Sequence, residues 1–440
     1  MTTYRATVMD TPRDPFRDGG DALVVDADAG VVVRDGVIVA RGPYAEIQAQ
    51  HPGDEVVELG GGVLLPGLID THVHYPQLRA IAGLGMPLLE WLERCALPEE
   101  CRLADDAYAR TIAADFLTCL ARSGTTSALV FGAHFASAMD IFFAAADRSG
   151  LRITAGQVLS DRILRPELLT TPEIALSEGR KLVERWHGQG RLRYAVTPRF
   201  SLSASEPMLD ACAELMQAAD GIWFTSHMNE NTAEVDRVVE LFAGAEHYLG
   251  SYHQHGLVTE RSVFAHNIHP TESELDLLAA TGAWVAHCPT SNAALGSGHF
   301  PLRRHIKHGA RVAIGSDVGA GTGLCLFKEG LQAYFIQQLQ GAHGLPLTPA
   351  HLLYLCTRAG AQALGSGDVV GDLAVNKAFD AIWLKPRDGS TLATVLEHAA
   401  DPSDALAKIF ALASPADIAR VWVSGDEVAS SGGTATTTQS

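Results

Sequence analysis

The sequence is poor in cysteine, and its cysteines form no pattern. Seven are scattered over 440 residues, no two stand in a CxxC pair, and their number is odd. This distribution argues against a disulfide framework. We therefore expect a protein of a reducing compartment, and place it in the cytoplasm.

Long apolar runs are also missing. No stretch of about twenty uninterrupted apolar residues is present that could span a bilayer. The first residues, MTTYRATVMDTPRDPF, lack the apolar core of a signal peptide. We expect a chain with no membrane anchor and no membrane partner.

Basic residues are scarce, since 33 lysines and arginines face 51 aspartates and glutamates and the formal net charge is -18. This surplus of negative charge disfavours nucleic acid and acidic membrane surfaces as partners. Hydrophobic residues make up 47% of the chain, which is enough for a sizeable core. The length suits a large barrel or α/β domain with an accessory domain.

Short apolar runs rich in β-branched residues alternate with helical patterns through the middle of the chain. The helical patterns include Asp106–Arg122 and Glu272–Thr281. Eight strands, each followed by a helix or a long loop, are the number that closes a (β/α)8 TIM barrel. The predicted strands are Gly62–Ile69, Thr126–Phe131, Ile153–Leu159, Leu192–Thr197, Ile222–His227, Ser262–His266, Ala283–His287 and Arg311–Gly315.

The two ends of the chain have a different character. Valine-rich β segments separated by Gly and Asp fill the first part, and a β pattern returns at Phe379–Leu384 and Ile418–Val423. We predict an α/β protein in which a barrel of residues 66–366 is flanked by a small β-sandwich domain. Residues 1–65 and 367–430 would form that domain, and the Ser/Thr/Gly-rich tail 431–440 is predicted to be disordered.

Histidines and an aspartate follow several of the predicted strands, where barrel enzymes hold their active sites. His72 and His74 come after the first strand, and residues i and i+2 of a strand face the same side. Asp317 follows the eighth strand. Alone, two histidines at a strand end are as often surface residues, and an aspartate there is more often a helix cap.

Two further strand ends carry residues of the same kind. His227 ends the fifth predicted strand, with Glu230 three residues later, and His266 ends the sixth. Glu230 alone could merely stabilise the start of the next helix. Histidines or an aspartate thus stand at the ends of the first, fifth, sixth and eighth strands, and this arrangement is improbable by chance. Imidazoles and a carboxylate suit zinc or ferrous iron, at which water becomes acidic enough to supply a nucleophile.

The fourth strand bears on the number of metals. It ends in Pro198-Arg199-Phe200, at a place where barrels that hold two metals often have a bridging lysine. An arginine side chain stays charged and cannot ligate a cation. We therefore expect one metal ion per subunit. The guanidinium group of Arg199, at the mouth of the barrel, is better suited to bind a carbonyl or carboxylate of the substrate.

Several motifs together resemble the amidohydrolase superfamily, and more narrowly its guanine deaminase family. They are Pro66–Gln77 (PGLIDTHVHYPQ), Leu88–Leu92 (LLEWL), Thr197–Ser203 (TPRFSLS), Ser226–Asn231 (SHMNEN), His287–Asn292 (HCPTSN) and Gly315–Asp317 (GSD). The resemblance implies His72, His74, His227 and Asp317 as ligands of one Zn²⁺. Fe²⁺ is the alternative, because the same ligands suit both ions. It also implies that Gln77, Arg199 and Phe200 contact a purine and that the protein is a homodimer.

The hypothesis that follows is hydrolytic deamination of guanine, a small-molecule substrate. Asp317 would accept the proton of water, His266 would orient its oxygen, and Glu230 would protonate the ring nitrogen next to C2. His227 and Glu230 would also line the substrate site. Trp91 or Phe200 could pack on the ring face, although an aromatic residue in a helical stretch is more often part of the core.

Other reactions stay possible on the sequence alone. The nearest are deamination of 8-oxoguanine or a pterin and hydrolysis of a triazine. Gln77 and Arg199 argue against the triazine and leave the guanine analogues open. A non-catalytic barrel used as an assembly module would be expected to have lost metal ligands, and none is lost here.

Overall fold

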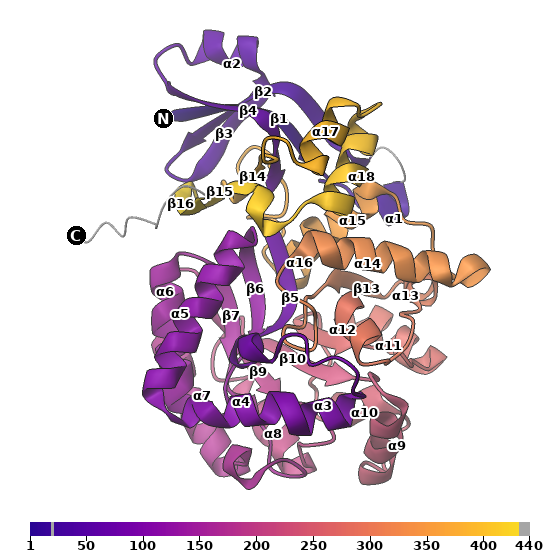
Figure 1. Cartoon of the computed structure of the whole chain (residues 1–440). Helices are drawn as coiled ribbons and strands as arrows, with labels where there is room; N and C mark the ends of the chain where they lie inside the picture. The colour runs from indigo at the N-terminus through magenta and orange to yellow at the C-terminus, as the bar shows by residue number, and fades with distance from the viewer. Residues whose placement is uncertain (19–21, 431–440) are drawn as a thin grey trace.

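The computed structural model describes residues 1–18 and 22–430 and contains two separate sheets (Figure 1). The predicted disordered tail, 431–440, lies outside the described residues. Strands from the middle of the chain form one sheet, and strands from its two ends form the other. None of the helices in the described part of the chain has the length and apolar character needed to span a bilayer.

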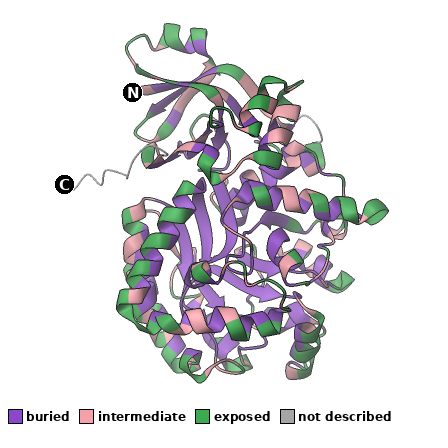
Figure 2. Ribbon diagram, viewed as in Figure 1, coloured by how far each residue is buried: buried purple, intermediate pink, exposed green. Residues whose placement is uncertain are grey.

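Eight parallel strands form the barrel. Every residue of five of them is buried, as expected for parallel strands covered on both faces. Figure 2 shows these buried strands enclosed by helices whose outer surfaces are exposed. In order around the sheet, the strands are β5 (Leu68–His74), β6 (Thr125–Phe131), β7 (Arg152–Gly156), β9 (Leu192–Pro198), β10 (Trp223–Met228), β11 (Ser262–His266), β12 (Trp284–His287) and β13 (Arg311–Ile314).

Backbone contacts between its first and last strands bring the barrel close to full closure. The backbone N–H of Asp317 donates to the carbonyl of His72 at 2.8 Å, and that of His74 donates to Val318 at 2.9 Å. The hydroxyl of Thr71 donates to the carbonyl of Ile314 at 2.8 Å. Because of these bonds, the segment after β13 lies directly beside the end of β5.

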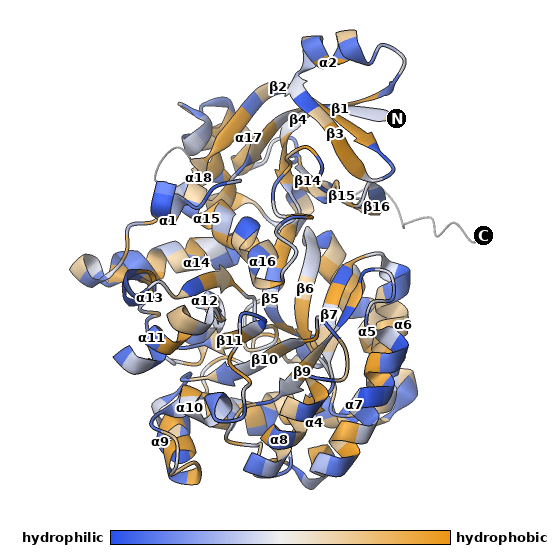
Figure 3. Cartoon of the chain, turned by 180° about the vertical axis from the view of Figure 1, so that it is seen from behind, coloured by the Kyte–Doolittle hydropathy of each residue, from blue (hydrophilic) through white to orange (hydrophobic). Residues whose placement is uncertain are grey.

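The helices around the barrel are amphipathic, and blue and orange residues alternate along them in Figure 3. In α5, for example, Ile112, Phe116 and Leu120 recur at a spacing of four and are buried. The principal outer helices are α5 (Asp106–Arg122), α6 (Ala136–Ser149), α7 (Pro172–Trp186), α8 (Glu206–Leu215), α9 (Thr232–Leu241), α10 (Tyr248–His253), α11 (Glu272–Thr281), α12 (Pro289–Ala294), α13 (Leu302–His308), α14 (Leu326–Leu339), α15 (Pro349–Cys356) and α16 (Arg358–Ala363).

Strands from both termini form a seven-stranded sheet. Its order is β16 (Asp426–Ser430), β15 (Ile418–Val423), β14 (Ala381–Leu384), β4 (Glu55–Pro66), β1 (Thr2–Asp10), β2 (Val24–Arg34) and β3 (Val37–Pro43). Two strands separate β1 from β15, yet the rings of Tyr4 and Trp422 lie only 5.4 Å apart. Neighbouring strands are about 4.8 Å apart, so in a flat sheet these two strands would lie about three times that distance apart. The sheet therefore folds over on itself and encloses a core. The short helix α2 (Tyr44–Gln50) packs against β2 and β3, whereas α18 (Pro402–Leu412) packs against α14, α15 and α17 (Thr391–Glu397).

The predicted fold class, a (β/α)8 barrel with a small β unit built from both termini, is confirmed. The limits of the two units, placed at residues 65 and 366, stay predictions. Two predicted strands are wrong in detail. Ile153–Leu159 is interrupted at Gln157, between β7 and the short strand β8 (Val158–Leu159), and Gly62–Ile69 is divided between the two sheets. β4 ends at Pro66 and pairs with β14, whereas β5 begins at Leu68 and pairs with β6.

The crossing between the sheets occurs at Gly67. A Cβ atom there would lie 2.2 Å from the hydroxyl oxygen of Thr126, so only glycine fits. The apolar run continues through both strands, and periodicity alone could not detect the change of sheet. As a consequence, His72 and His74 lie within the first barrel strand and not after it.

Candidate active site

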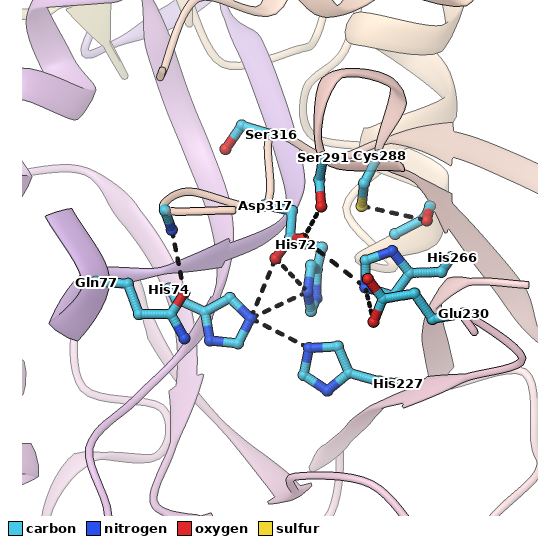
Figure 4. A network of polar contacts seen from close by, with 12 residues as sticks. His72, His74, Gln77, His227, Glu230, His266, Cys288, Ser291, Ser316 and Asp317 are labelled. Carbon is cyan, nitrogen blue, oxygen red and sulfur yellow. Dashed lines mark hydrogen bonds and ion pairs between the residues drawn. The ribbon is translucent and has the colours of Figure 1, made fainter. Parts of the chain in front are cut away.

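Three histidines and one aspartate meet at the carboxyl ends of the barrel strands (Figure 4). His72 and His74 lie at the end of β5, His227 lies in β10, and Asp317 follows β13. All four side chains are buried, and one ligand atom from each lies within 4.8 Å of all the others. Among the described residues, this is the one cluster of that kind.

The distances within the cluster suit a shared cation. The Nε2 atom of His74 lies 3.2 Å from Nε2 of His72 and 3.1 Å from Nε2 of His227. The Oδ1 atom of Asp317 lies 3.2 Å from Nε2 of both His72 and His74. Three imidazole nitrogens converging on one carboxylate oxygen match the donor set of a divalent metal site.

The protonation states of these groups also suit metal binding. The Nδ1 of His227 donates to the backbone carbonyl of Arg199, which leaves the lone pair of Nε2 directed at the cluster. Burial lowers the pKa of His72, lowers that of His74 to about 4, and lowers that of His227 well below its usual range. Neutral imidazoles are the form that ligates metals. The cluster therefore fits a divalent cation.

Asp317 is held as a carboxylate. Burial would raise the pKa of Asp317, but contacts with His72 and His74 and the charge of His266 outweigh burial and lower it well below its usual range. Its second oxygen, Oδ2, accepts a hydrogen bond of 2.6 Å from the hydroxyl of Ser291. One oxygen is thus directed at the cation site, while the other is held by the protein.

Two residues at the mouth are held in left-handed backbone conformations. His266 has a φ of 73° and Asp317 a φ of 49°. Such values are uncommon for residues other than glycine and occur where the surrounding structure enforces them, often at functional sites. They turn the chain sharply at the ends of β11 and β13, where both side chains face the cluster.

Glu230 and His266 form a second pair beside the cluster. The Nε2 of His266 lies 3.5 Å from Oε2 of Glu230 and 3.8 Å from Oδ2 of Asp317. The other ring nitrogen of His266 lies 2.9 Å from Oδ1 of Asn292, which orients the imidazole. Burial raises the pKa of Glu230 well above its usual range, and the negative charges of Asp317 and Glu234 add to this effect. The raised pKa favours the protonated carboxyl of Glu230, which is the form that can donate a proton.

A pocket lies above the cluster, and nearly all of the residues predicted for the site line it. His72 lies beneath the pocket, in contact with His74 and Asp317. The lining consists of His74, Gln77, Leu88, Trp91, Leu92, Arg199, Phe200, His227, Glu230, His266, Leu295, Asp317 and Ala320.

One wall of this pocket is apolar and comes from the segment between β5 and β6. Leu88 and Trp91 lie in α3 (Leu88–Trp91), and Leu92 follows directly. Trp91 is 2% exposed, and Phe200, which follows β9, is 4% exposed. The structure thus places Trp91 at the pocket, although its contact with a ligand stays a prediction. Apolar side chains around a few polar groups are typical of small-molecule sites.

Some residues that support this site were given no role on the basis of the sequence. Ser291 and Asn292 follow β12, and their position at a strand end was a usable signal. Glu100 carries no such signal, because it lies in the short helix α4 (Leu97–Cys101), next to Glu99 and outside the barrel strands. Yet it is 2% exposed and accepts a hydrogen bond of 2.6 Å from Arg199.

The buried pair of Arg199 and Glu100 leads to a prediction about stability. Changing Arg199 to alanine is expected to lower the free energy of unfolding by roughly 3–5 kcal/mol, because it leaves a buried carboxylate without its cation. Urea unfolding followed by circular dichroism measures this change. Arg199→Lys keeps the positive charge and is expected to lose much less. Equal stability of wild type and Arg199→Ala would contradict the pairing.

Comparison with known proteins agrees with this geometry. The model of the amidohydrolase family matches residues 63–428, and that of a bacterial imidazolonepropionase-like composite domain matches residues 29–53. A probable guanine deaminase of Deinococcus radiodurans is 61% identical over 433 residues, covering 97% of this chain and 98% of that protein. The guanine deaminase of Escherichia coli is 34% identical over 97% of both chains. Its solved structure superimposes with a TM-score of 0.94 over 98% of this chain and 100% of that one.

Proposed function

The chain belongs to the amidohydrolase family and, within it, to the guanine deaminases, and we propose that it hydrolyses guanine to xanthine and ammonia. The observation that carries the proposal is one pocket that joins a cation site to polar groups suited to a purine. In the reaction, the bond between C2 and the exocyclic nitrogen breaks and a bond between C2 and a water oxygen forms.

The pocket suits a flat, neutral ring with polar edges. Gln77 can both donate and accept hydrogen bonds, and Arg199 can donate to a carbonyl. We assign Arg199 to the purine carbonyl and Gln77 to another edge of the ring. Trp91 and Phe200 are assigned to the ring faces, where aromatic side chains gain contact area.

We assign the metal as one Zn²⁺ per subunit, held by His72, His74, His227 and Asp317. Fe²⁺ is the alternative, because the same ligands suit both ions. When bound, such a cation lowers the pKa of water from about 15.7 to about 7 and so supplies a nucleophile at neutral pH. The support is the donor set and its geometry.

The chain's own residues move the protons. Asp317, a carboxylate beside the cation site, accepts the proton of the attacking water. His266 lies 3.5 Å from Glu230 and 3.8 Å from Asp317, a place from which it orients the water oxygen. Glu230 donates a proton to the ring nitrogen next to C2. It then carries to the amine the proton that Asp317 took from water, so that the amine leaves as ammonia, and the proton of the new C2 hydroxyl returns Glu230 to its acid form. Its Oε1 atom is buried and has no hydrogen-bond partner among the described residues, which leaves it available to a ligand.

The proposal is tested by following ammonia release from guanine, 8-oxoguanine, adenine and cytosine. Guanine is expected to have the highest kcat/KM. Adenine is expected to react about 10⁴-fold more slowly, because it lacks the carbonyl that Arg199 is assigned to bind and leaves buried polar groups unpaired. 8-Oxoguanine is the closest competitor, since its six-membered ring is the same as that of guanine. Faster release from adenine or cytosine than from guanine would overturn the proposal.

We further propose that the enzyme is a homodimer of the cytoplasm that serves purine catabolism. In support of the compartment, all seven cysteines are free, as expected in a reducing environment. The dimer is proposed from the resemblance to the family. Sedimentation equilibrium of the purified protein tests it, and a mass of one chain at micromolar concentration would refute it.

A further inference from the structure

Glu100 is a buried acid outside the reaction centre described above. It lies in α4, which belongs to the segment between β5 and β6 and is drawn in Figure 1 in front of the barrel. Its side chain is 2% exposed. Burying a carboxylate is costly unless it is paired and hydrogen-bonded, so its contacts define what it does.

Three side chains from three different segments donate to Glu100. Its Oε1 accepts a bond of 2.7 Å from Nε2 of Gln77, and its Oε2 accepts one of 2.6 Å from Nη1 of Arg199. The Nε2 of His134 lies 3.2 Å from the same Oε2. Gln77 and Arg199 come from segments 122 positions apart in sequence (199 − 77), and both line the pocket.

We propose that Glu100 is the positioning residue for purine recognition, because it sets the orientation of the Gln77 amide and neutralises the charge of Arg199. This inference rests on the proposed function, in which Gln77 and Arg199 read the edges of guanine. Glu100 acts through these two residues and is assigned no contact with the substrate.

The orientation of Gln77 follows from hydrogen-bond chemistry. A carboxylate only accepts, so Gln77 must present its NH₂ group to Glu100. At the other end of the amide, Oε1 accepts a bond of 3.1 Å from the backbone N–H of Gly319, a contact drawn in Figure 4. If the amide were turned over, its oxygen would face the carboxylate of Glu100 and its NH₂ group would face the N–H of Gly319. Neither contact could then be a hydrogen bond. The donor and acceptor that remain for a ligand are therefore fixed.

The charge of Arg199 is balanced in the same contact. An arginine in a protein stays charged, and an unpaired cation in a buried pocket would favour an anionic ligand. Burial would raise the pKa of Glu100, but Arg199 and His134 outweigh burial and hold that pKa well below its usual range. A neutral pair of guanidinium and carboxylate can still donate to a neutral carbonyl, which is what guanine offers.

The test compares Glu100→Gln with wild type on two ligands. In the variant, KM for guanine is expected to rise about 10- to 100-fold, the size of a lost hydrogen bond to a charged group, while kcat changes little. Xanthine, the product, ionises more readily than guanine because of its second ring carbonyl. Its inhibition constant is expected to fall in the variant, because Arg199 is no longer neutralised. A variant that was merely damaged would bind both ligands more weakly.

Two further variants keep the test decisive. Glu100→Asp keeps the charge but shortens the side chain, so KM for guanine should rise while xanthine inhibition stays at the wild-type level. Glu93 lies in the same segment and is exposed, and Glu93→Gln should match wild type in both measurements. Binding of guanine to Glu230→Gln and to the double variant Glu230→Gln/Glu100→Gln, measured by calorimetry, repeats the comparison without turnover.

The outcomes separate this inference from the proposed function. If wild type turns over guanine and Glu100→Gln has an unchanged KM, the assignment of Glu100 is overturned alone. Equal weakening of guanine and xanthine would also overturn it. If wild type does not deaminate guanine, the proposed function fails and this inference fails with it. A raised KM for guanine together with tighter xanthine inhibition is the expected result.

Discussion

Replacement of Asp317 by asparagine is expected to lower kcat/KM for guanine by at least about 10⁴-fold. The amide cannot accept a proton, and loss of a general base alone costs about 10²–10⁴-fold. Asparagine is also a weaker ligand than a carboxylate at the cation site, where Oδ1 lies 3.2 Å from His72 and from His74. Without the cation, the nucleophile that it would supply is lost as well. The expected fall in kcat/KM therefore reaches or exceeds the upper end of the range for a general base.

Two measurements check this expectation. Steady-state kinetics report the activity, and elemental analysis of the purified variant reports zinc and iron per chain, which should fall well below one. Asp388 is exposed, so Asp388→Asn makes the same chemical change away from the site and should retain both metal and activity. Full metal content with near wild-type turnover in Asp317→Asn would remove Asp317 from both assigned roles.

Replacement of Glu230 by glutamine is expected to lower kcat about 10²–10⁴-fold while metal content and guanine binding persist. The amide has nearly the same shape but cannot release a proton. Glu230 lies beside His266 at 3.5 Å and makes none of the contacts within the metal cluster, so the cluster should remain intact. Single-turnover kinetics on the metal-loaded variant isolate the chemical step.

The pH profile adds a second measurement of the same residue. Because burial raises the pKa of Glu230, its carboxyl stays protonated at pH values where an exposed glutamate is ionised. As a proton donor it is active below that pKa, and wild-type kcat should fall as the pH rises through it. Glu230→Gln should lose this alkaline limb. The exposed residue Glu246 provides the matched control, Glu246→Gln, and a normal kcat in Glu230→Gln would exclude the residue as the acid.

The barrel and the cation site could be predicted because both depend on local patterns. Alternation of apolar strands and helical segments is encoded within each segment, and parallel strands all end at one mouth. His72 and His74 share a face because strand side chains alternate. His227 lies in β10 and Asp317 follows β13, so their contacts with these histidines could be expected at the same mouth of the barrel. The roles of these residues in catalysis stay predictions.

Tertiary structure alone decided the place of Gly67 and Glu100. The chain changes sheets at Gly67 within one continuous apolar run, and glycine is needed there because the backbone lies against Thr126. Glu100 has the sequence surroundings of a solvated helical acid, yet Gln77 and Arg199 surround it. Periodicity records which face of an element is apolar, and it carries no information about which distant side chains meet a charge. Whether a carboxylate is exposed or buried in a pair depends on those partners, and they come together only when the chain is folded.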